Sequence, residues 1–171
     1  ESHFLKAEGA LKGWNVGGSA QSFYESGITT SFAQLSTSGA AAYIADDTSM
    51  PADFSDPLNP GNNILAQNLV TVKWSDAVTN EVKLQKIITQ KWIAGFPDGQ
   101  EAWADTRRTG YPKGYPIINS LNPDVPVTGI MRRLTFTTTE YSTNAAAVTA
   151  AVTLLGGPDK NNTKLWWDKK P

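Results

Sequence analysis

The sequence predicts a mainly α-helical fold, in which a helix pair is followed by further helices joined by long irregular loops, with little β structure. Three segments, 1–12, 20–35 and 78–96, carry apolar residues at the spacing of a helical turn. Ten prolines and fourteen glycines punctuate the chain, chiefly between these segments. A length of 171 residues is sufficient for one domain with its own hydrophobic core.

The helix pair is predicted at the start of the chain. Residues 1–12 form the first helix, and the sequence GWNVGG at 13–18 forms a turn. Ser19 stands where it can cap a second helix over 20–35, because its hydroxyl can accept from a free backbone N–H. Small residues stand where the two helices would touch, and the pair resembles one unit of a tetratricopeptide-type repeat.

A single repeat unit of this kind cannot bury its own apolar face. The chain also opens at Glu1 directly into a helical pattern, without a methionine or a convincing cap. We therefore expect a piece of a longer chain with further helices upstream. Apolar helix faces would then be exposed where those helices are missing.

The middle of the chain is predicted as a loop followed by a long helix. Turn residues punctuate 36–61, and 64–74 is compatible with either a strand or the start of a helix. Ser75 or Asp76 is expected to cap the helix over 78–96. The row of apolar residues in that helix ends in Trp92 and Phe96, which we therefore expect in the core.

Pro97-Asp98-Gly99 ends this helix, and a short helical turn with Trp103 and Asp105 follows. Asp105 and Arg108 are three residues apart, so one helical turn would bring their charges together. An internal ion pair is favoured over a guanidinium site for a carboxylate or phosphate ligand. We expect Trp103, which lies between two alanines, in the core.

Glu101 and Asp105 share one helix face, but they do not resemble a catalytic pair. A glycosidase needs two carboxylates on opposite sides of a cleft, one of them with a raised pKa. Two acids beside the adjacent arginines Arg107 and Arg108 are expected to be neutralised instead. No catalytic residue is predicted.

The last third of the chain is predicted to be irregular around one helix. Prolines break 113–126, and 131–139 is compatible with a short strand or an extended segment. Ser142 or Thr143 is expected to cap a helix over 144–155, which ends at Gly156-Gly157-Pro158. The tail after that helix is irregular.

Composition excludes several functional classes. A net charge of −1 without a basic block argues against nucleic-acid binding. The absence of cysteine excludes disulfides, thiolate metal sites and a cysteine nucleophile. No apolar run approaches the ~20 residues that a membrane-spanning helix needs. With His3 as its only histidine, the chain has no histidine metal cluster or obvious triad, and no cofactor is predicted.

Two stretches are rich in the oxygen-bearing side chains that calcium sites use. Four aspartates, at 46, 47, 53 and 56, crowd one loop, and 159–163 alternates oxygen-bearing side chains. Neither has the central glycine and terminal glutamate of an EF-hand, so solvated turns are the preferred interpretation and no metal site is predicted.

Aromatic residues near loops are the remaining candidates for ligand binding. A sugar platform needs an exposed ring with polar neighbours. Tyr43 and Trp74 border the long polar loop and are the candidate ligand-binding residues. Packing is the alternative for both, because large aromatic rings dominate ordinary cores.

Five segments together resemble the C-terminal part of the SusD/RagB family. They are FLKAEGALKGW at 4–14, GITTSF at 27–32, ITQKWIAGFPDGQEAWADTRRTGYP at 88–112, the pair Arg132-Arg133, and LGGPD with LWWDKK near the end. The resemblance implies a right-handed superhelix of tetratricopeptide-like helix pairs. Residues 1–36 would be the last pair, and 37–171 the loop-rich helical C-terminal region of a single domain roughly three times longer.

The resemblance also implies a function. Members of the family are non-catalytic surface proteins that capture oligosaccharides, and each acts as a lid on a TonB-dependent transporter of the SusC type. They sit at the outer face of the outer membrane through a lipid anchor on an N-terminal cysteine, which is absent here. No ligand-binding residue can be transferred from the family. The residues that match its motifs are interpreted as structural: Trp103, Asp105, Arg107, Arg108, Tyr111 and Trp167.

Two alternatives remain open. The chain could belong to an interaction scaffold that binds a transporter and a non-glycan nutrient, in which case partner binding would occur without a response to sugar. It could also be a fragment of a glycoside hydrolase, which would turn over a glycan.

Overall fold

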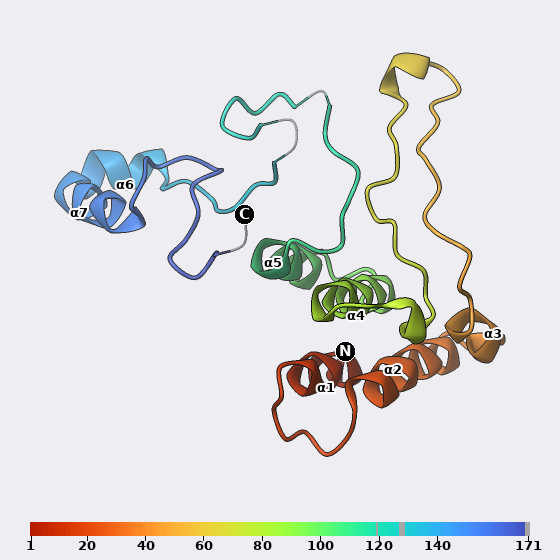
Figure 1. The fold of residues 1–171 in the computed structure, drawn as a ribbon. Helices are drawn as coiled ribbons and strands as arrows, with labels where there is room; N and C mark the ends of the chain where they lie inside the picture. Colours follow the sequence, from red (N-terminus) through yellow and green to blue (C-terminus); the bar gives the residue numbers. More distant parts are fainter. Residues whose placement is uncertain (119, 127–128, 170–171) are drawn as a thin grey trace.

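The computed structural model describes residues 1–118, 120–126 and 129–169, and it is helical (Figure 1). Among these residues the β pairing consists of one isolated antiparallel bridge between Phe54 and Ile64. The predicted mainly α fold with long irregular loops is confirmed. The α-helices are α1 (Ser2–Leu11), α2 (Ala20–Gln34), α3 (Ala40–Ile44), α4 (Asn80–Ala94), α5 (Gly99–Thr109), α6 (Thr138–Thr143) and α7 (Ala145–Leu155), and the 3-10 turns are η1 (Pro60–Asn62) and η2 (Trp74–Asp76).

The hairpin of α1 and α2 is close-packed because of a glycine. The ring of Phe4, which is 1% exposed, lies directly on Gly27. A Cβ atom at position 27 would be 2.7 Å from two atoms of that ring, so only glycine allows this approach without a shift. Ser19 caps α2 as predicted, and its hydroxyl accepts from the Ser22 backbone N–H at 3.1 Å.

The core lies where α4 packs against α1 and α2. Tyr24 is fully buried at its centre, with its ring centroid 5.1 Å from that of Trp74. Its hydroxyl donates to the Val72 carbonyl at 2.7 Å, which satisfies the one polar atom of the ring. Burial raises the pKa of Tyr24 well above its ordinary value.

A buried lysine on α4 holds the segment that leads to it. The Lys86 ammonium donates to the carbonyl and hydroxyl of Thr71 at 2.7 and 2.9 Å, and to the Lys73 carbonyl at 2.6 Å. These three bonds use all three N–H donors. Burial lowers the pKa of Lys86. The ambiguous segment 64–74 is therefore mostly irregular: beyond the bridge at Ile64 it forms no paired strand, it is anchored on α4, and only Trp74 at its end belongs to the 3-10 turn η2.

Residues 46–73, here called the arm, run out from the helices and back (orange through yellow to yellow-green in Figure 1). The Lys73 backbone N–H donates to the Asp46 carbonyl at 2.9 Å, and Lys73 pairs with Asp47 at 2.8 Å. These contacts close the base of the arm, and η1 forms its far end. The prediction of a loop over 36–61 missed two short elements that lie within this range, α3 and η1.

Short helices and caps account for the differences from prediction. The cap of α4 is Thr79, not Ser75 or Asp76, because both of those residues belong to the separate turn η2. The residues expected to cap the helix over 144–155 form α6 instead, which Thr137 caps by accepting from the Glu140 N–H. Thr137 and Glu140 have the Thr-x-x-Glu spacing that signals the start of a helix.

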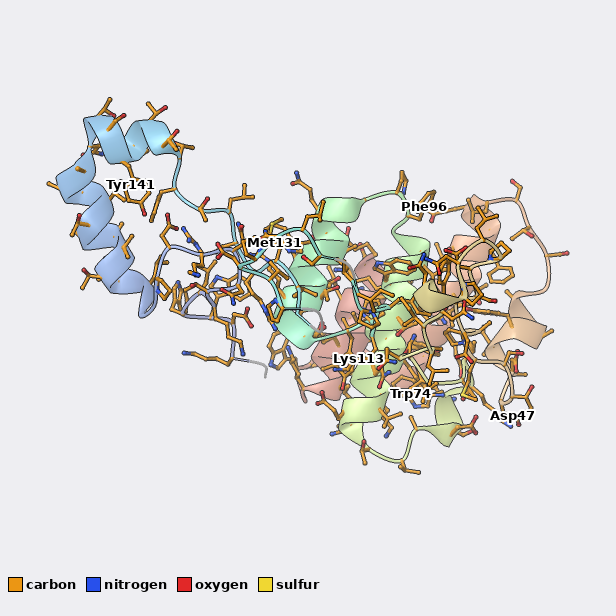
Figure 2. All side chains as sticks on the ribbon, turned by 90° about the horizontal axis from the view of Figure 1, so that it is seen from above. Asp47, Trp74, Phe96, Lys113, Met131 and Tyr141 are labelled. Atoms are coloured by element: carbon orange, nitrogen blue, oxygen red, sulfur yellow. The ribbon has the colours of Figure 1, made fainter. Side chains whose placement is uncertain are left out.

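The α6–α7 hairpin lies apart from α1–α5 in both views (Figures 1 and 2). Asp159 ties it to the tail, because its carboxylate pairs with Arg133 and accepts from the Tyr141 hydroxyl at 2.8 Å. The stretch 131–136 is extended without being a strand, and the Arg132 and Arg133 N–H groups share the Asn161 carbonyl. In the described ranges, no helix combines the length and apolarity required to cross a bilayer.

Candidate functional site

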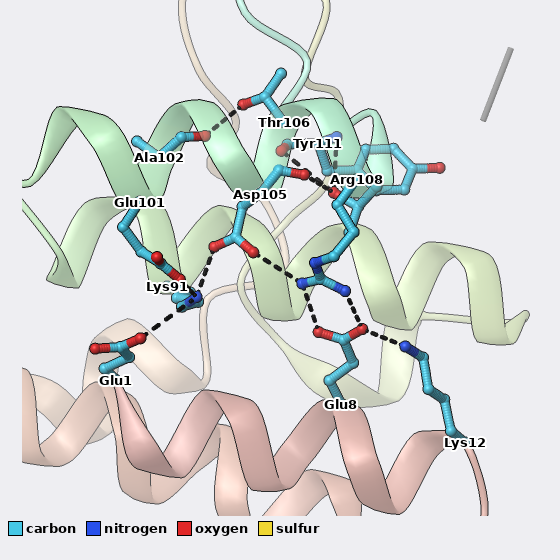
Figure 3. Close-up of polar contacts among 11 residues, drawn as sticks. Glu1, Glu8, Lys12, Lys91, Glu101, Ala102, Asp105, Thr106, Arg108 and Tyr111 are labelled. Atoms are coloured by element: carbon cyan, nitrogen blue, oxygen red, sulfur yellow. Dashed lines mark hydrogen bonds and ion pairs between the residues drawn. The ribbon is translucent and has the colours of Figure 1, made fainter. Parts of the chain in front are cut away.

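A network of buried charges joins α1, α4 and α5 (Figure 3). Asp105 lies at its centre, with one carboxylate oxygen 2.7 Å from Lys91 and the other 2.8 Å from Arg108. The two terminal nitrogens of Arg108 also donate to the two carboxylate oxygens of Glu8, at 2.5 and 2.9 Å. Lys91 reaches Glu101 at 2.5 Å. The predicted pair of Asp105 and Arg108 is present, and Glu101 and Asp105 are neutralised as expected.

The electrostatics of this network favour the charged forms of Glu8 and Lys91. Burial raises the pKa of Glu8, but hydrogen bonds from Arg108 and Lys12 outweigh it, so that the net pKa is lowered. Burial likewise lowers the pKa of Lys91, but Asp105 and Glu101 outweigh it and the net pKa is raised. A carboxylate held ionised between cations cannot serve as a general acid, so this network binds helices together.

The lowered pKa of Glu8 predicts a pH dependence of stability. A depressed pKa stabilises the fold above the ordinary value of 4.5, and this stabilisation is lost as the pH falls through the folded-state value. The difference in unfolding free energy between the wild type and Glu8→Gln should therefore be largest near neutral pH and shrink in acid. Urea titrations of both proteins from pH 7 to pH 3 would measure it, and a constant difference would contradict the prediction.

A second cluster fixes the tail of the chain to α5. The Arg107 guanidinium lies 3.6 Å from the ring centroid of Trp103 and 5.0 Å from that of Trp167. It also donates to the Arg132 carbonyl at 2.7 Å. Asp168, which follows Trp167, pairs with Arg132 at 2.9 Å. The stacked cation and rings therefore connect three separate segments.

Two further motif residues, Trp103 and Tyr111, also make contacts near α5. Trp103 was expected in the core but is half-buried, because its ring covers Arg107 while its Nε1–H donates to the Met131 carbonyl at 2.6 Å. Tyr111 is buried, and its hydroxyl donates to Glu81 at 2.8 Å. Burial and this bond to Glu81 raise the pKa of Tyr111 to about 12. Six motif residues thus lie in contacts that hold α5 in place, namely Trp103, Asp105, Arg107, Arg108, Tyr111 and Trp167.

The two candidate ligand-binding residues, Tyr43 in α3 and Trp74 in η2, flank the two ends of the arm. Trp74 is 8% exposed and packs against Tyr24. Tyr43 is half-buried, with its ring centroid 5.5 Å from that of Phe32, and its hydroxyl bonds to the Gln90 side chain. Little ring surface is open to a sugar, and the ligand-binding role of both residues stays a prediction.

The four loop aspartates serve separate local purposes. The Asp46 carboxylate accepts from the backbone N–H groups of residues 48 and 49, and Asp47 pairs with Lys73. Asp53 accepts from the Ala66 N–H at 2.8 Å, and Asp56 accepts from the N–H groups of residues 58 and 59. Within the ranges described, no three acidic or histidine side chains converge on a common metal position.

The structure instead exposes an aromatic pair that the sequence analysis did not single out. Phe54 on the arm and Tyr115 beyond α5 are each 46% exposed, with ring centroids 6.2 Å apart. The available signal was one aromatic residue in each of two proline-containing loops. Their contact joins distant segments and could not be inferred from local spacing.

A groove of about 650 Å³ separates the ends of α2, α4 and α5. Its walls include Leu35, Trp92 and Phe96, which are 75%, 50% and 86% exposed. The prediction that Trp92 and Phe96 lie in the core was wrong for the chain in this structure. The apolar row of α4 continues past the buried Ile88 into a region where none of the described residues covers it.

Comparison with known proteins identifies the family. The model of the SusD-like family, described as Susd and RagB outer membrane lipoprotein, matches residues 1–168. The chain belongs to the SusD-like family. No protein with a curated description matched the chain.

Solved structures of SusD-like proteins have the same fold. A chitin-binding SusD homologue from Flavobacterium johnsoniae is 53% identical, with a TM-score of 0.93 over 99% of this chain and 36% of its own. A SusD-like protein from Bacteroides thetaiotaomicron is 48% identical, with a TM-score of 0.91 over 99% of this chain and 36% of its own. A homologue from Bacteroides uniformis is 44% identical, with a TM-score of 0.87 over 98% of this chain and 36% of its own. The chain therefore spans about a third of the length of these relatives.

Proposed function

We propose that this SusD-like protein captures a glycan at the cell surface without cleaving it. The observation that carries the proposal is the 53% identity, over 99% of this chain, with a SusD homologue that binds chitin. Chitin oligosaccharides are accordingly the first ligands to test. A non-glycan nutrient and a pure scaffold role are the alternatives.

The arrangement of carboxylates supports a role without catalysis. A glycosidase needs a proton donor with a raised pKa opposite a second carboxylate, with the sugar between them. Glu8, Glu101 and Asp105 instead make ion pairs with cations at 2.5–2.9 Å. A hydrolase fragment remains the least supported alternative.

We propose further that the chain is the C-terminal portion of one SusD-like domain. Residues 1–36 would be its last tetratricopeptide-like pair, and 37–171 its loop-rich C-terminal region. The groove beside Trp92 and Phe96 supports the proposal that the chain is one portion of a larger domain, because an apolar surface of this kind is expected to be covered in a complete domain. The relatives are about three times longer than this chain, which is consistent with a further part that would cover the groove in the complete domain.

Membership of the family supports a proposal for the partner and the location. The family is one of outer-membrane lipoproteins. We infer that the complete protein is lipid-anchored at the outer face of the outer membrane and closes as a lid over a TonB-dependent transporter of the SusC type. The oligosaccharide would be held beneath this lid before transport.

A glycan array tests the proposed function. The complete protein is applied to immobilised oligosaccharides that include chitin fragments, and heat-denatured protein serves as the control. Binding to one sugar class is the expected result. An array without any bound sugar would contradict glycan capture and favour a non-glycan nutrient or a scaffold.

A further inference from the structure

Three hollows beside α2 and α4 run into one another. The first has a volume of about 190 Å³ and lies at the edge of the core, against Phe4 and Tyr43. The second is the groove beside Phe96, and the third, of about 110 Å³, borders Lys91. The groove shares lining residues with both of its neighbours, namely Ser31, Ile93 and Ala94 with the first hollow and Trp92, Asp98 and Ala102 with the third. The three hollows therefore form one continuous depression, here called the trough.

The two ends of the trough differ in chemistry. At the first hollow the walls include Phe4 and Ile28, which are 1% and 2% exposed, so this end reaches the hydrophobic core. Four carboxylates line the opposite end, those of Glu1, Asp98, Glu101 and Asp105. Lys91 lies among them, and Arg108 is shared between Asp105 and Glu8, so the acids outnumber the cations. An occupant that is complementary to the trough therefore has an apolar end and a basic end.

The middle of the trough is a continuous apolar surface. Leu35, Trp92, Ile93 and Phe96 line it and are 48–86% exposed. Exposed apolar surface of this kind marks an interaction site. Two relatives, 53% and 48% identical, match this chain over only 36% of their own length, and the rest belongs to the same polypeptide. The remainder of the complete protein is thus the source of an occupant that the comparisons favour.

The walls of the trough favour a helix over an extended segment. They come from α2, α4, α5 and the residues that join α4 to α5. Among the described residues, β pairing is confined to one bridge on the arm, so the trough offers side chains and no strand edge. An extended segment needs such an edge for its backbone hydrogen bonds. A helix pairs its own backbone and inserts side chains spaced three or four residues apart.

We propose that the trough seats an amphipathic helix from the part of the complete protein that lies outside this chain. One large apolar side chain of that helix fills the first hollow beside Phe4, and a lysine or arginine at its other end meets the carboxylates of Asp98 and Glu101. The apolar face between them covers Trp92 and Phe96. This inference rests on the proposal that the chain is the C-terminal portion of a longer SusD-like domain, and it specifies the chemistry of the segment that completes it.

Photocrosslinking of the complete protein tests the proposal. Phe96 is replaced with the photoreactive residue p-benzoylphenylalanine, the purified protein is irradiated, and mass spectrometry locates the crosslink. The expected product has the mass of one chain and joins position 96 to a helical segment outside residues 1–171. Trp14 is the matched control, because it is also aromatic and exposed but lies beyond the other end of α2. The same replacement at Trp14 should crosslink to that segment about tenfold less or weaker still, since only a seated helix has a high effective concentration at position 96.

The crosslinked segment itself decides the outcome. Apolar residues three or four positions apart with a lysine or arginine towards one end support the proposal. A product with the mass of two chains would show that a second copy occupies the trough, and it would overturn the proposal. Absence of a crosslink to the remainder of the chain, or a crosslinked segment without a basic residue, would overturn it as well. No sugar is present, so an open trough would leave glycan capture standing, and a glycan array without binding would leave the trough assignment standing.

Discussion

Replacing Lys91 with methionine is expected to destabilise the protein by about 3–5 kcal/mol, because it breaks a buried ion pair from one side. The side chains of Lys91 and Asp105 are only 4% and 6% exposed, and they lie 2.7 Å apart. Without the ammonium, Asp105 would keep Arg108 as a partner but would lose the cation that balances its second oxygen. Methionine preserves most of the volume, so the change isolates the charge.

Urea unfolding followed by circular dichroism would measure this effect. Lys12→Met is the matched control, because Lys12 belongs to the same network but its side chain is 46% exposed. An exposed pair contributes about 0–1 kcal/mol, so the control should unfold close to the wild type. Equal stabilities of Lys91→Met and Lys12→Met would contradict the assignment of the network as a support for the helices.

Replacing Phe4 with alanine is expected to cost about 3–5 kcal/mol, the usual range for removing a buried aromatic ring. Phe4 is 1% exposed and fills the space between α1 and α2 above Gly27. The surrounding helices cannot collapse fully into the space, because α4 holds both of them. Leu5→Ala is the control on the same helix, since Leu5 is 48% exposed.

A double-mutant cycle makes this prediction sharper. Gly27→Ala alone should destabilise the protein, because the new Cβ would lie 2.7 Å from the Phe4 ring. In the Phe4→Ala background the same methyl group would enter vacated space, so its cost should fall or change sign. Additive effects of the two substitutions would show that the ring and the glycine are not in contact.

Local rules predicted the parts of this fold that depend on neighbouring residues. The helix pair and the Ser19 cap each follow from a few adjacent side chains. Pro97 and Gly99 also predict that the helix stops nearby, although α4 ends at Ala94 and not at the predicted Phe96. The pair of Asp105 and Arg108 follows from helical spacing alone. Two short helices, α3 and α6, were missed because five or six residues carry too little periodicity to be detected.

Local sequence rules could not predict the contacts between segments that are distant in the sequence. Arg108 meets Glu8 across 100 positions, and Tyr24 meets Val72 across 48, so the charge network and the core centre were recognised only in part. Trp92 and Phe96 have the spacing of core residues, but they are 50% and 86% exposed, because none of the described residues covers them. The contact between Phe54 and Tyr115 likewise depends on how the arm folds back onto the helices.

Capture without cleavage is the central claim, and one measurement tests it directly. The complete protein is incubated with chitotetraose near its dissociation constant, bound and free sugar are separated, and both fractions are analysed by mass spectrometry. Recovery of intact tetrasaccharide from the bound fraction is the predicted result. Shorter products that appear with time would identify a hydrolase, and an empty bound fraction would show that chitotetraose is not the captured ligand.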